Sequence, residues 1–336
     1  MARCTAITGA TGHVGGNLVR ALLARGDSVR CLVHEDDRAI RGLDVERCEG
    51  DVRKLETLRP LLDGADRVFH LAAIISIDGD RGGLVQAVNI DGTRNVAIAA
   101  LDAGVRRFVH CCSVHAFDQA PLDEPVDETR LRATGPRHLA YDRSKAAGEA
   151  AVREVVARGL DAVIVHPSGV IGPYDFKRSR MGQVLLDLFR RKLVALVPGG
   201  FDWVDVRDVV GGMLVAAEQG RTNESYVLSG HWHSVREIAA MAEAVTGVPA
   251  PRITAPLALA RIGAPFVTVY HRVFGGEPLF TNESLDALRA NRNLVHDKAT
   301  RELGYAPRPI ADSIRDAYAW FEETGHIRVG SLQATL

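Results

Sequence analysis

The sequence predicts an α/β fold, a doubly wound parallel sheet with a smaller, interleaved C-terminal domain. Three observations predict it. A short apolar run at residues 4–7 enters a glycine-rich turn and then an amphipathic helix. Short apolar strands then alternate with helices through residue 167, and alternation with short links is typical of a parallel sheet. Beyond residue 168 the alternation loosens, which indicates a second, smaller region.

The expected elements of the first half follow from the spacing of apolar residues and from the turn residues that separate the apolar runs. Strands are short apolar runs bounded by turn residues. They cover residues 28–33, a short stretch just before Glu49, and residues 67–71, 108–113 and 162–166. Helices carry apolar residues at helical spacing, and they cover residues 55–62, 84–103 and 141–157. A loop rich in Asp, Glu and Pro, residues 118–136, precedes the last of these helices.

The second half is expected to be mostly helical. The helices cover residues 182–190, 209–218, 235–246, an apolar stretch at 255–274, and 311–323. Residues 202–206 are expected to form a strand that returns to the main sheet. The aromatic cluster His231-Trp232-His233 is expected to be a loop packed on that sheet.

Composition excludes several classes of protein. The chain has 336 residues, 46% of them apolar, and a net charge of −1. Such a charge gives no field that would steer the chain to nucleic acid or anionic lipid. The five cysteines form no C-x-x-C pair, the twelve histidines show no metal-binding spacing, and the amino terminus lacks a signal-peptide layout. An uncharged apolar run of about 18 residues is also missing. We expect a cytoplasmic protein with reduced thiols, no metal and no transmembrane segment.

A glycine fingerprint occupies the first strand–helix junction. Gly9, Gly12 and Gly15 are spaced G-x-x-G-x-x-G, one residue longer than the common dinucleotide-binding pattern. In such a turn the first glycine allows the bend, the second lets the backbone approach a pyrophosphate, and the third lets the helix pack on the strand. The amide groups at the helix start then face the phosphates. The alternative is a glycine-rich turn without a ligand.

Tyr141 and Lys145 form a Tyr-x-x-x-Lys pair on an expected helix, which puts both side chains on one face, one turn apart. An ammonium group beside a phenol lowers the pKa of the phenol from about 10, so that it can exchange a proton near neutral pH. Ser113 ends an earlier strand and could hydrogen-bond a substrate oxygen. Such a pair also occurs by chance on surface helices, but its order after the fingerprint and Ser113 favours catalysis.

With these residues in place, the chain resembles the extended short-chain dehydrogenase/reductases, within the NAD-dependent epimerase/dehydratase superfamily. The resemblance covers nearly the whole sequence. Seven ordered motifs carry it: residues 8–15 (TGATGHVG), 50–52 (GDV), 70–73 (HLAA), 89–93 (NIDGT), 111–113 (CCS), 141–145 (YDRSK) and 167–173 (PSGVIGP).

The resemblance implies a Rossmann fold and roles for three catalytic residues. Tyr141 would be the acid/base, Lys145 would lower the pKa of Tyr141 and bind the nicotinamide ribose, and Ser113 would polarise the substrate oxygen. It also implies a possible homodimer formed by two helices from each chain. Apolar surface for it could come from Ile98, Ala99, Val152 and Val155, although packing against the sheet needs similar residues.

The resemblance further implies which residues contact the cofactor. Asp51 and Val52 would flank the adenine, and Ala72 and Asn89 would line the cofactor channel. The expected set is Gly9, Thr11, Gly12, His13, Val14, Gly15, Arg30, His34, Asp51, Val52, Leu71, Ala72, Ala73, Asn89, Tyr141, Lys145, Pro167, Gly169 and Val170. Residues 1–167, with 201–230 returning, are assigned to the dinucleotide-binding domain, and residues 168–200 and 231–336 to the substrate-binding region.

The end of the second strand bears on the choice between NAD and NADP. An acid about 20 positions after the fingerprint selects NAD, and the chain has Val33 there. The similar dihydroflavonol reductase branch is NADP-linked and carries an arginine where His34 stands. Arg30, His34 and Arg38 therefore favour NADP, with NAD possible, because Glu35 would repel a 2′-phosphate. The alternative for Arg30 is a side chain that faces solvent.

Gly169 bears on the reaction. Nucleotide-sugar epimerases and dehydratases usually carry an asparagine at this position, whereas the segment here resembles the dihydroflavonol reductase and 3β-hydroxysteroid dehydrogenase branches. The expected function is an NAD(P)-dependent oxidoreductase that interconverts a ketone or aldehyde and an alcohol on an apolar small molecule. The alternatives are a nucleotide-sugar 4-epimerase or dehydratase with transient hydride transfer, and a non-catalytic NADP(H)-binding regulator.

Apolar residues of the second half could line a substrate pocket. The stretch 255–274 suits an apolar substrate or a lid over one, or it is a core helix. Phe176, Met181, Phe201 and Trp203 could line such a pocket, although core packing is the usual role of such residues.

Overall fold

The computed structural model describes residues 3–76, 79–261, 285–286 and 288–328, and its centre is a parallel sheet of seven strands. The strand order is β3-β2-β1-β4-β5-β6-β9. The strands are β1 (Cys4–Thr8), β2 (Ser28–Val33), β3 (Glu46–Glu49), β4 (Arg67–His70), β5 (Arg107–Cys111), β6 (Ala162–Pro167) and β9 (Ser225–Leu228). The order reverses between β1 and β4, and ligands of such sheets bind at the carboxyl edge of this point.

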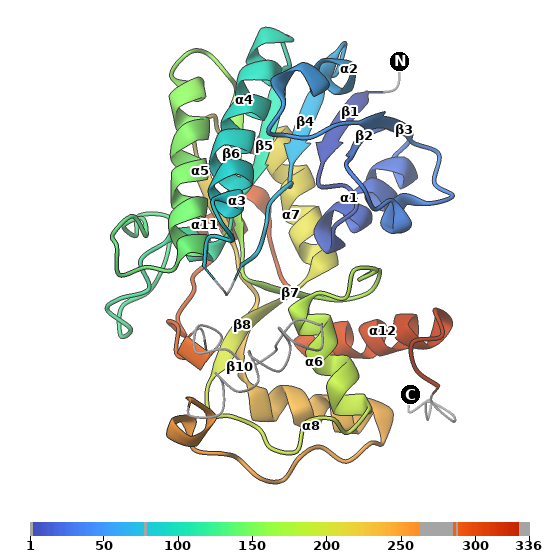
Figure 1. Cartoon of the computed structure of the whole chain (residues 1–336), viewed down its shortest axis with the longest axis vertical. Coiled ribbons are helices and arrows are strands. Elements are labelled where there is room, and N and C mark those ends of the chain that lie inside the picture. The colour runs from blue at the N-terminus through green and yellow to red at the C-terminus, as the bar shows by residue number, and fades with distance from the viewer. Residues whose placement is uncertain (1–2, 77–78, 262–284, 287, 329–336) are drawn as a thin grey trace.

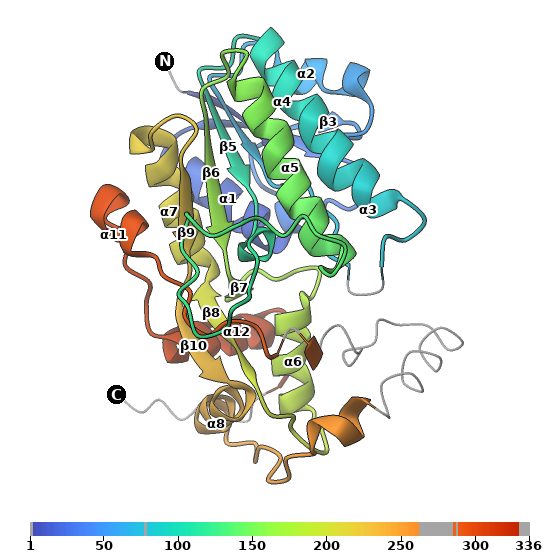
Figure 2. The same cartoon turned by 90° about the vertical axis from the view of Figure 1, so that its left-hand side faces the viewer.

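Helices cover both faces of this sheet, as Figures 1 and 2 show. One face carries α1 (His13–Ala24), α7 (Val206–Gln219) and α11 (Asp297–Leu303), and the other carries α2 (Arg59–Leu62), α4 (Thr93–Asp102) and α5 (Ala140–Val156). The doubly wound α/β prediction is therefore confirmed. Val152 and Val155 lie inside the second of these cores, so the prediction that they supply dimer surface is wrong.

The expected helix over residues 84–103 is one continuous helical run in three parts. It starts as α3 (Leu84–Gln86), passes through a π-helical turn (Ala87–Gly92) and continues as α4. The π turn contains Asn89, which is 3% exposed. Such turns widen a helix locally and often occur at functional sites.

A second, three-stranded sheet lies below the main one in Figure 1. It consists of β7 (Gly169–Ile171), β8 (Gly200–Asp205) and β10 (His231–Ser234), packed with α6 (Arg180–Phe189), α8 (Val235–Thr246) and α12 (Ile310–Glu323). The prediction that residues 202–206 return to the main sheet is wrong, because β8 pairs with β7 and β10. The strand that joins the main sheet is β9, beside β6.

Two further predictions need comment. Residues 231–233 form strand β10 rather than a loop, because they pair antiparallel with β8. Most of the apolar stretch 255–274 lies outside the described residues; a helix begins at Leu257, and Leu257 and Ala260 pack against Val197 and Leu288. The division into a dinucleotide-binding domain and a substrate-binding region stays a prediction.

Membrane and thiol predictions can be compared with the described chain. None of its helices combines the length and apolar character that a membrane span requires. Each of the five cysteines, all within the described ranges, carries a free thiol.

His110 on β5 offers a test of the core. Its side chain is 2% exposed, it stacks on His70, and within the described residues neither ring nitrogen has a hydrogen-bond partner. Burial lowers its pKa well below the ordinary value. We expect His110→Phe to raise the free energy of unfolding by about 1–2 kcal/mol at pH 7, because unpaired buried polar groups are removed.

The pH dependence of that variant follows from the same burial. As pH falls below about 6.5, the unfolded histidine takes up a proton that the folded one refuses, so the wild type loses stability. The advantage of His110→Phe should therefore widen from pH 7 to pH 5 in urea unfolding. An unchanged difference between the two pH values would contradict this account of His110.

Candidate active site

The glycine fingerprint forms a tight cradle between β1 and α1. Gly9 has φ of +74°, and a Cβ there would lie 2.6 Å from the backbone nitrogen of Ala72. A Cβ on Gly15 would overlap the carbonyl oxygen of Gly9. At Gly12, the nearest described atom would be the Gly9 oxygen at 3.4 Å, an ordinary contact. The first and third glycines therefore close the turn, and the second leaves room above it.

The amino terminus of α1 opens onto this cradle. Its N-cap is Gly12, and no side chain among the described residues caps it. Its first amide groups thus keep their donors for an outside anion. The imidazole of His13 is turned away, since its Nε2 donates to the Pro173 carbonyl at 3.0 Å. These features fit the pyrophosphate of a dinucleotide, with the backbone amides of residues 13–15 as donors, since the Gly12 amide donates to the Gly9 carbonyl.

A buried histidine joins the two central strands beside the cradle. Nε2 of His70 donates to Oγ1 of Thr93 at 2.9 Å, because that hydroxyl gives its own proton to the Asn89 carbonyl. Nδ1 of His70 therefore accepts from Oγ1 of Thr8, at 2.7 Å. Burial lowers the pKa of His70 to about 3, so the ring stays neutral. The Thr8–His70 hydrogen bond holds the ends of β1 and β4 together. Leu71, Ala72 and Ala73 follow directly after the end of β4.

Asn89 links the segment after β4 to the helix that carries the predicted catalytic pair. Its amide exchanges two hydrogen bonds with the backbone of Ile74 and donates to Oγ of Ser144 at 2.9 Å. Ser144 in turn donates to the Tyr141 carbonyl at 2.7 Å. The side chain predicted to line the cofactor channel thus also aligns the first turn of α5.

The structure brings the three predicted catalytic side chains together at the carboxyl edge of β5. Ser113 follows this strand and is 7% exposed. Its hydroxyl lies beside the phenol of Tyr141 on the first turn of α5, near enough to lower the pKa of that phenol. Lys145, one turn later, is 5% exposed, and its Nζ donates to the Cys111 carbonyl at 3.1 Å. Two hydroxyl groups with a buried ammonium group beside them can hydrogen-bond a substrate oxygen and transfer a proton to it.

The pKa of Tyr141 differs from the expectation. Loss of solvent around the ring raises the pKa of the phenol above its ordinary value, and the Ser113 hydrogen bond opposes this rise only in part. A net lowering of the Tyr141 pKa is therefore not seen in the chain alone, because burial dominates; the Lys145 ammonium group donates to the Cys111 carbonyl, and its own effect on the phenol stays a prediction. Tyr141 therefore keeps its proton at neutral pH in the chain alone.

The residues predicted on the adenosine side fall into two groups. His34 lies at the carboxyl end of β2, with Nε2 3.6 Å from the Asp51 carboxylate, and the neighbouring Val52 packs against Gly92. Arg30 is not brought to this group. Its guanidinium donates to the Glu46 carboxylate and to the carbonyls of residues 61 and 63.

The chain after β2 is more acidic than the NADP prediction assumed. Arg38 forms a two-pronged ion pair with Asp36, at 3.0 and 2.9 Å. The Arg38 hydrogen bond lowers the pKa of Asp36 to about 2. Arg38 is nevertheless half exposed on its side chain, at 53%, so its remaining donors can face a ligand.

Pro167, Gly169 and Val170 lie where the chain leaves the main sheet. Pro167 ends β6, and the other two belong to β7, which pairs with β8. A Cβ on Gly169 would lie 2.9 Å from the Asp202 carbonyl. A side chain at this position is therefore excluded by strand pairing.

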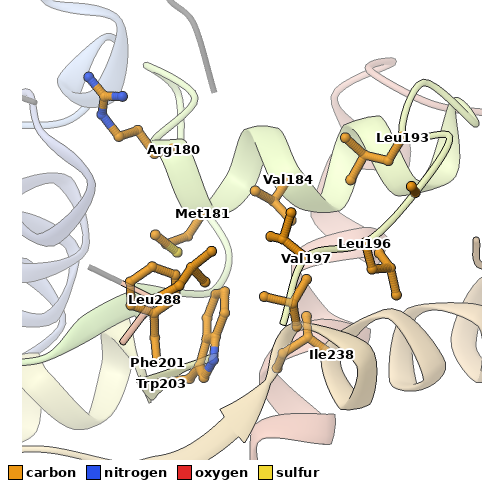
Figure 3. A pocket seen from close by; sticks show the side chains of 12 residues that line it. Arg180, Met181, Val184, Leu193, Leu196, Val197, Phe201, Trp203, Ile238 and Leu288 are labelled. Carbon is orange, nitrogen blue, oxygen red and sulfur yellow. The ribbon is translucent and has the colours of Figure 1, made fainter. Parts of the chain in front are cut away.

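A mostly apolar pocket opens in the region of the second sheet. Figure 3 shows Met181, Phe201 and Trp203 facing Val184 and other aliphatic side chains across it. The space, with the open solvent at its mouth included, is about 720 Å³. Phe176 lies elsewhere, against Trp320 at 5.1 Å between ring centres.

Sequence reasoning missed a second polar pair beside the catalytic hydroxyls. Nδ1 of His115 lies 3.0 Å from the Asp142 carboxylate, and its ring meets Tyr141 edge-on at 5.5 Å. The sequence signal that could have revealed this pair is its position, because Asp142 directly follows Tyr141 and His115 lies two residues after Ser113. Their contact crosses 27 residues of sequence, which local patterns do not predict.

A buried cluster behind Ser113 has the composition of a metal site. Ligand atoms of Cys112, Glu149 and His166 lie within 4.8 Å of one another. The Glu149 carboxylate is already held by Arg132 and Arg153 at 2.8 Å each. Against the effect of burial, His166 and these two arginines lower its pKa to about 2. His166 donates through Nδ1 to the Ser113 carbonyl at 3.0 Å. These donors and acceptors are used internally, so the cluster is a structural network.

Residues 5–229 match the profile of the NAD dependent epimerase/dehydratase family. The chain belongs to this family. It is therefore an enzyme that uses a nicotinamide dinucleotide, NAD or NADP, and the predicted resemblance is confirmed.

Relatives extend the match over the full chain. Sterol demethylase protein B of Methylococcus capsulatus is 39% identical, covering 96% of this chain and 99% of the relative. A 4-hydroxy-2-methyl-3-oxo-4-farnesyl-3,4-dihydroquinoline-1-oxide ketoreductase of Stigmatella aurantiaca is 32% identical, covering 90% and 92%. The crystal structure of the protein gox2253 superimposes with a TM-score of 0.83 at 34% identity, covering 98% and 100%. This member of the epimerase/dehydratase family is thus similar to proteins named for reduction and for sterol chemistry.

Proposed function

We propose that the chain is an NADP-dependent oxidoreductase that interconverts a ketone and a secondary alcohol on an apolar small molecule. The observation that carries the proposal is the grouping of Ser113, Tyr141 and Lys145 at the carboxyl edge of the main sheet, with Lys145 Nζ bonded to the Cys111 carbonyl and the Ser113 hydroxyl beside the Tyr141 phenol. The uncapped start of α1 lies at the same edge. The apolar pocket around Phe201 and Trp203 supports the apolar substrate.

The chemistry assigned to the protein is proton transfer and orientation. When bound, the cofactor supplies a hydride to the carbonyl carbon. Ser113 donates a hydrogen bond to the carbonyl oxygen and fixes its position. Tyr141, whose pKa is raised by burial, gives its proton to the same oxygen, which becomes the alcohol hydroxyl. Lys145 stabilises the phenolate that this transfer leaves behind.

The names of two relatives support the substrate class. One is named a ketoreductase of a farnesylated quinoline oxide, and the other is named for sterol demethylation. Both names denote compounds with a large apolar part. We therefore propose a polycyclic or isoprenoid ketone as substrate, with its apolar part in the pocket of Figure 3.

A cofactor oxidation assay tests the proposal. We expect the purified enzyme to consume NADPH with apolar cyclic ketones, followed by absorbance at 340 nm and by mass analysis of the alcohol. Conversion of a nucleotide sugar without net cofactor oxidation would replace the proposal by the epimerase alternative. Gly169 argues against that outcome, because the Asp202 carbonyl leaves no room there for the asparagine side chain that nucleotide-sugar enzymes usually carry.

Arg38 tests the preference for NADP. Its exposed guanidinium is the charge that we expect to pair with the 2′-phosphate. Arg38→Ala should raise the KM for NADPH about tenfold and leave the KM for NADH within about twofold, since one charge-assisted hydrogen bond is worth about 1.5–3 kcal/mol. Equal effects on both cofactors would contradict the assignment. Arg30→Ala is the matched control, because the Arg30 guanidinium donates to the Glu46 carboxylate and to the carbonyl of residue 63.

A further inference from the structure

His115 and Asp142 join the two elements that carry the catalytic hydroxyls. His115 lies on the short turn after β5, two residues beyond Ser113, and Asp142 lies on the first turn of α5, next to Tyr141. Their hydrogen bond of 3.0 Å therefore crosses the same gap as the Ser113–Tyr141 pair. Two parallel links between the turn and the helix leave little freedom for either element to shift.

We propose that His115 and Asp142 are a positioning pair that sets the distance and angle between Ser113 and Tyr141 for proton transfer. The inference rests on the proposed function of those two hydroxyls. Catalytic groups must be held within a fraction of an ångström of their working geometry, and outer groups that hold them typically contribute 10–100-fold to activity.

The contacts around the pair support a positioning role. A carboxylate only accepts hydrogen bonds, so Nδ1 of His115 carries the proton and its ring orientation is fixed by Asp142. The fixed ring then lies edge-on against the phenol ring of Tyr141, with centres 5.5 Å apart. The backbone N–H of His115 also donates to Oγ of Ser113 at 3.2 Å. One residue thus touches both hydroxyl-bearing side chains.

The pair adds a side-chain link beside the Lys145–Cys111 bond, which already joins α5 to the end of β5. The helix α5 starts at Leu139 without a side-chain cap among the described residues. Ser113 is held from behind by His166 through its carbonyl, and Tyr141 through its carbonyl by Ser144. Those bonds fix the backbone of each residue. The His115–Asp142 bond couples the two elements to each other.

The test separates hydrogen bonding from charge. Asp142→Ala removes the acceptor, and Asp142→Asn keeps an oxygen that can accept from Nδ1 of His115. We expect Asp142→Ala to lower kcat 10–100-fold, with the KM for NADPH and for the ketone within about twofold. Asp142→Asn should stay within about threefold of the wild-type kcat. Loss of kcat in Asp142→Asn equal to that in Asp142→Ala would overturn the proposal.

A double-mutant cycle completes the experiment. His115→Ala should lower kcat as much as Asp142→Ala does, and the double variant should be no slower than either within about twofold, because both remove one link. Additive losses, or a change in KM alone, would refute the coupling. Glu154→Ala is the matched control, since it removes an exposed ion pair with Arg94 from the far end of the same helix.

Two further measurements keep the outcome interpretable. Thermal unfolding and NADPH binding of each variant show whether it is folded. His115→Asn keeps a hydrogen-bond donor for Asp142, and it replaces any alanine variant that does not fold. Wild-type kcat in a folded Asp142→Ala refutes the positioning pair alone. Retained turnover in Tyr141→Phe would refute the proposed function itself.

Discussion

Tyr141→Phe should abolish reduction while leaving the cofactor in place. We expect kcat to fall about 10³-fold, because general acid catalysis of this kind contributes 10²–10⁴-fold. The change removes one oxygen, which bonds the Ser113 hydroxyl, so the dissociation constant for NADPH should stay within about twofold. We expect turnover to stop while the dissociation constant for NADPH, measured by fluorescence titration, stays unchanged. Turnover within tenfold of wild type would remove Tyr141 from the mechanism.

The raised pKa of Tyr141 adds a pH signature to this prediction. Because burial holds the phenol protonated near neutral pH, the acid form needed for ketone reduction is present throughout pH 6–8. We therefore expect kcat for reduction to be flat over this range. Alcohol oxidation requires the phenolate and should rise with pH over the same range. The opposite pattern would show that another group exchanges the proton.

Gly15→Ala should have the second largest effect, on cofactor binding. A Cβ at this position would overlap the Gly9 carbonyl oxygen. The position of a Cβ is fixed by the backbone and the oxygen is itself a backbone atom, so no side-chain rotation relieves the overlap. The start of α1 must then move off β1, which displaces the amide groups that face the pyrophosphate. We expect the dissociation constant for NADPH to rise at least 100-fold, and the free energy of unfolding to fall by about 1–3 kcal/mol.

Gly211→Ala is the matched control for that variant. Gly211 lies inside α7, and among the described residues nothing lies within 4 Å of a Cβ built there. Alanine should therefore stabilise the helix by up to about 1 kcal/mol and leave NADPH binding unchanged. Unaltered NADPH affinity in Gly15→Ala, measured side by side, would show that the close approach of α1 to β1 is dispensable.

The centre of the main sheet was predictable because its central strands are buried on both faces. The strand β6 is buried at every position, so its apolar run is visible without knowledge of its neighbours. The second sheet was not predictable in the same way. Trp203 and Val204 of β8 would suit either sheet, and the choice depends on backbone pairing with Gly169 and Val170. The strand β9 was missed because it is four residues long and follows a charged turn.

The candidate site shows the same division between local and distant information. Gly9 and Gly15 could be recognised from spacing, because their roles concern one turn and the helix after it. Tyr141 and Lys145 share a helix, so their common face was also a local property. The direction of the Tyr141 pKa could not be obtained this way, since it depends on how the folded chain excludes water around the ring.

The network around Asn89 has a consequence for engineering. Its hydrogen bonds, and those of His70, run between Thr8, Thr93 and Ser144, all before residue 168. The apolar pocket is built from residues after 179. Chimeras that exchange the pocket-bearing segments between relatives can therefore preserve the alignment of catalytic groups and change which compound is accepted.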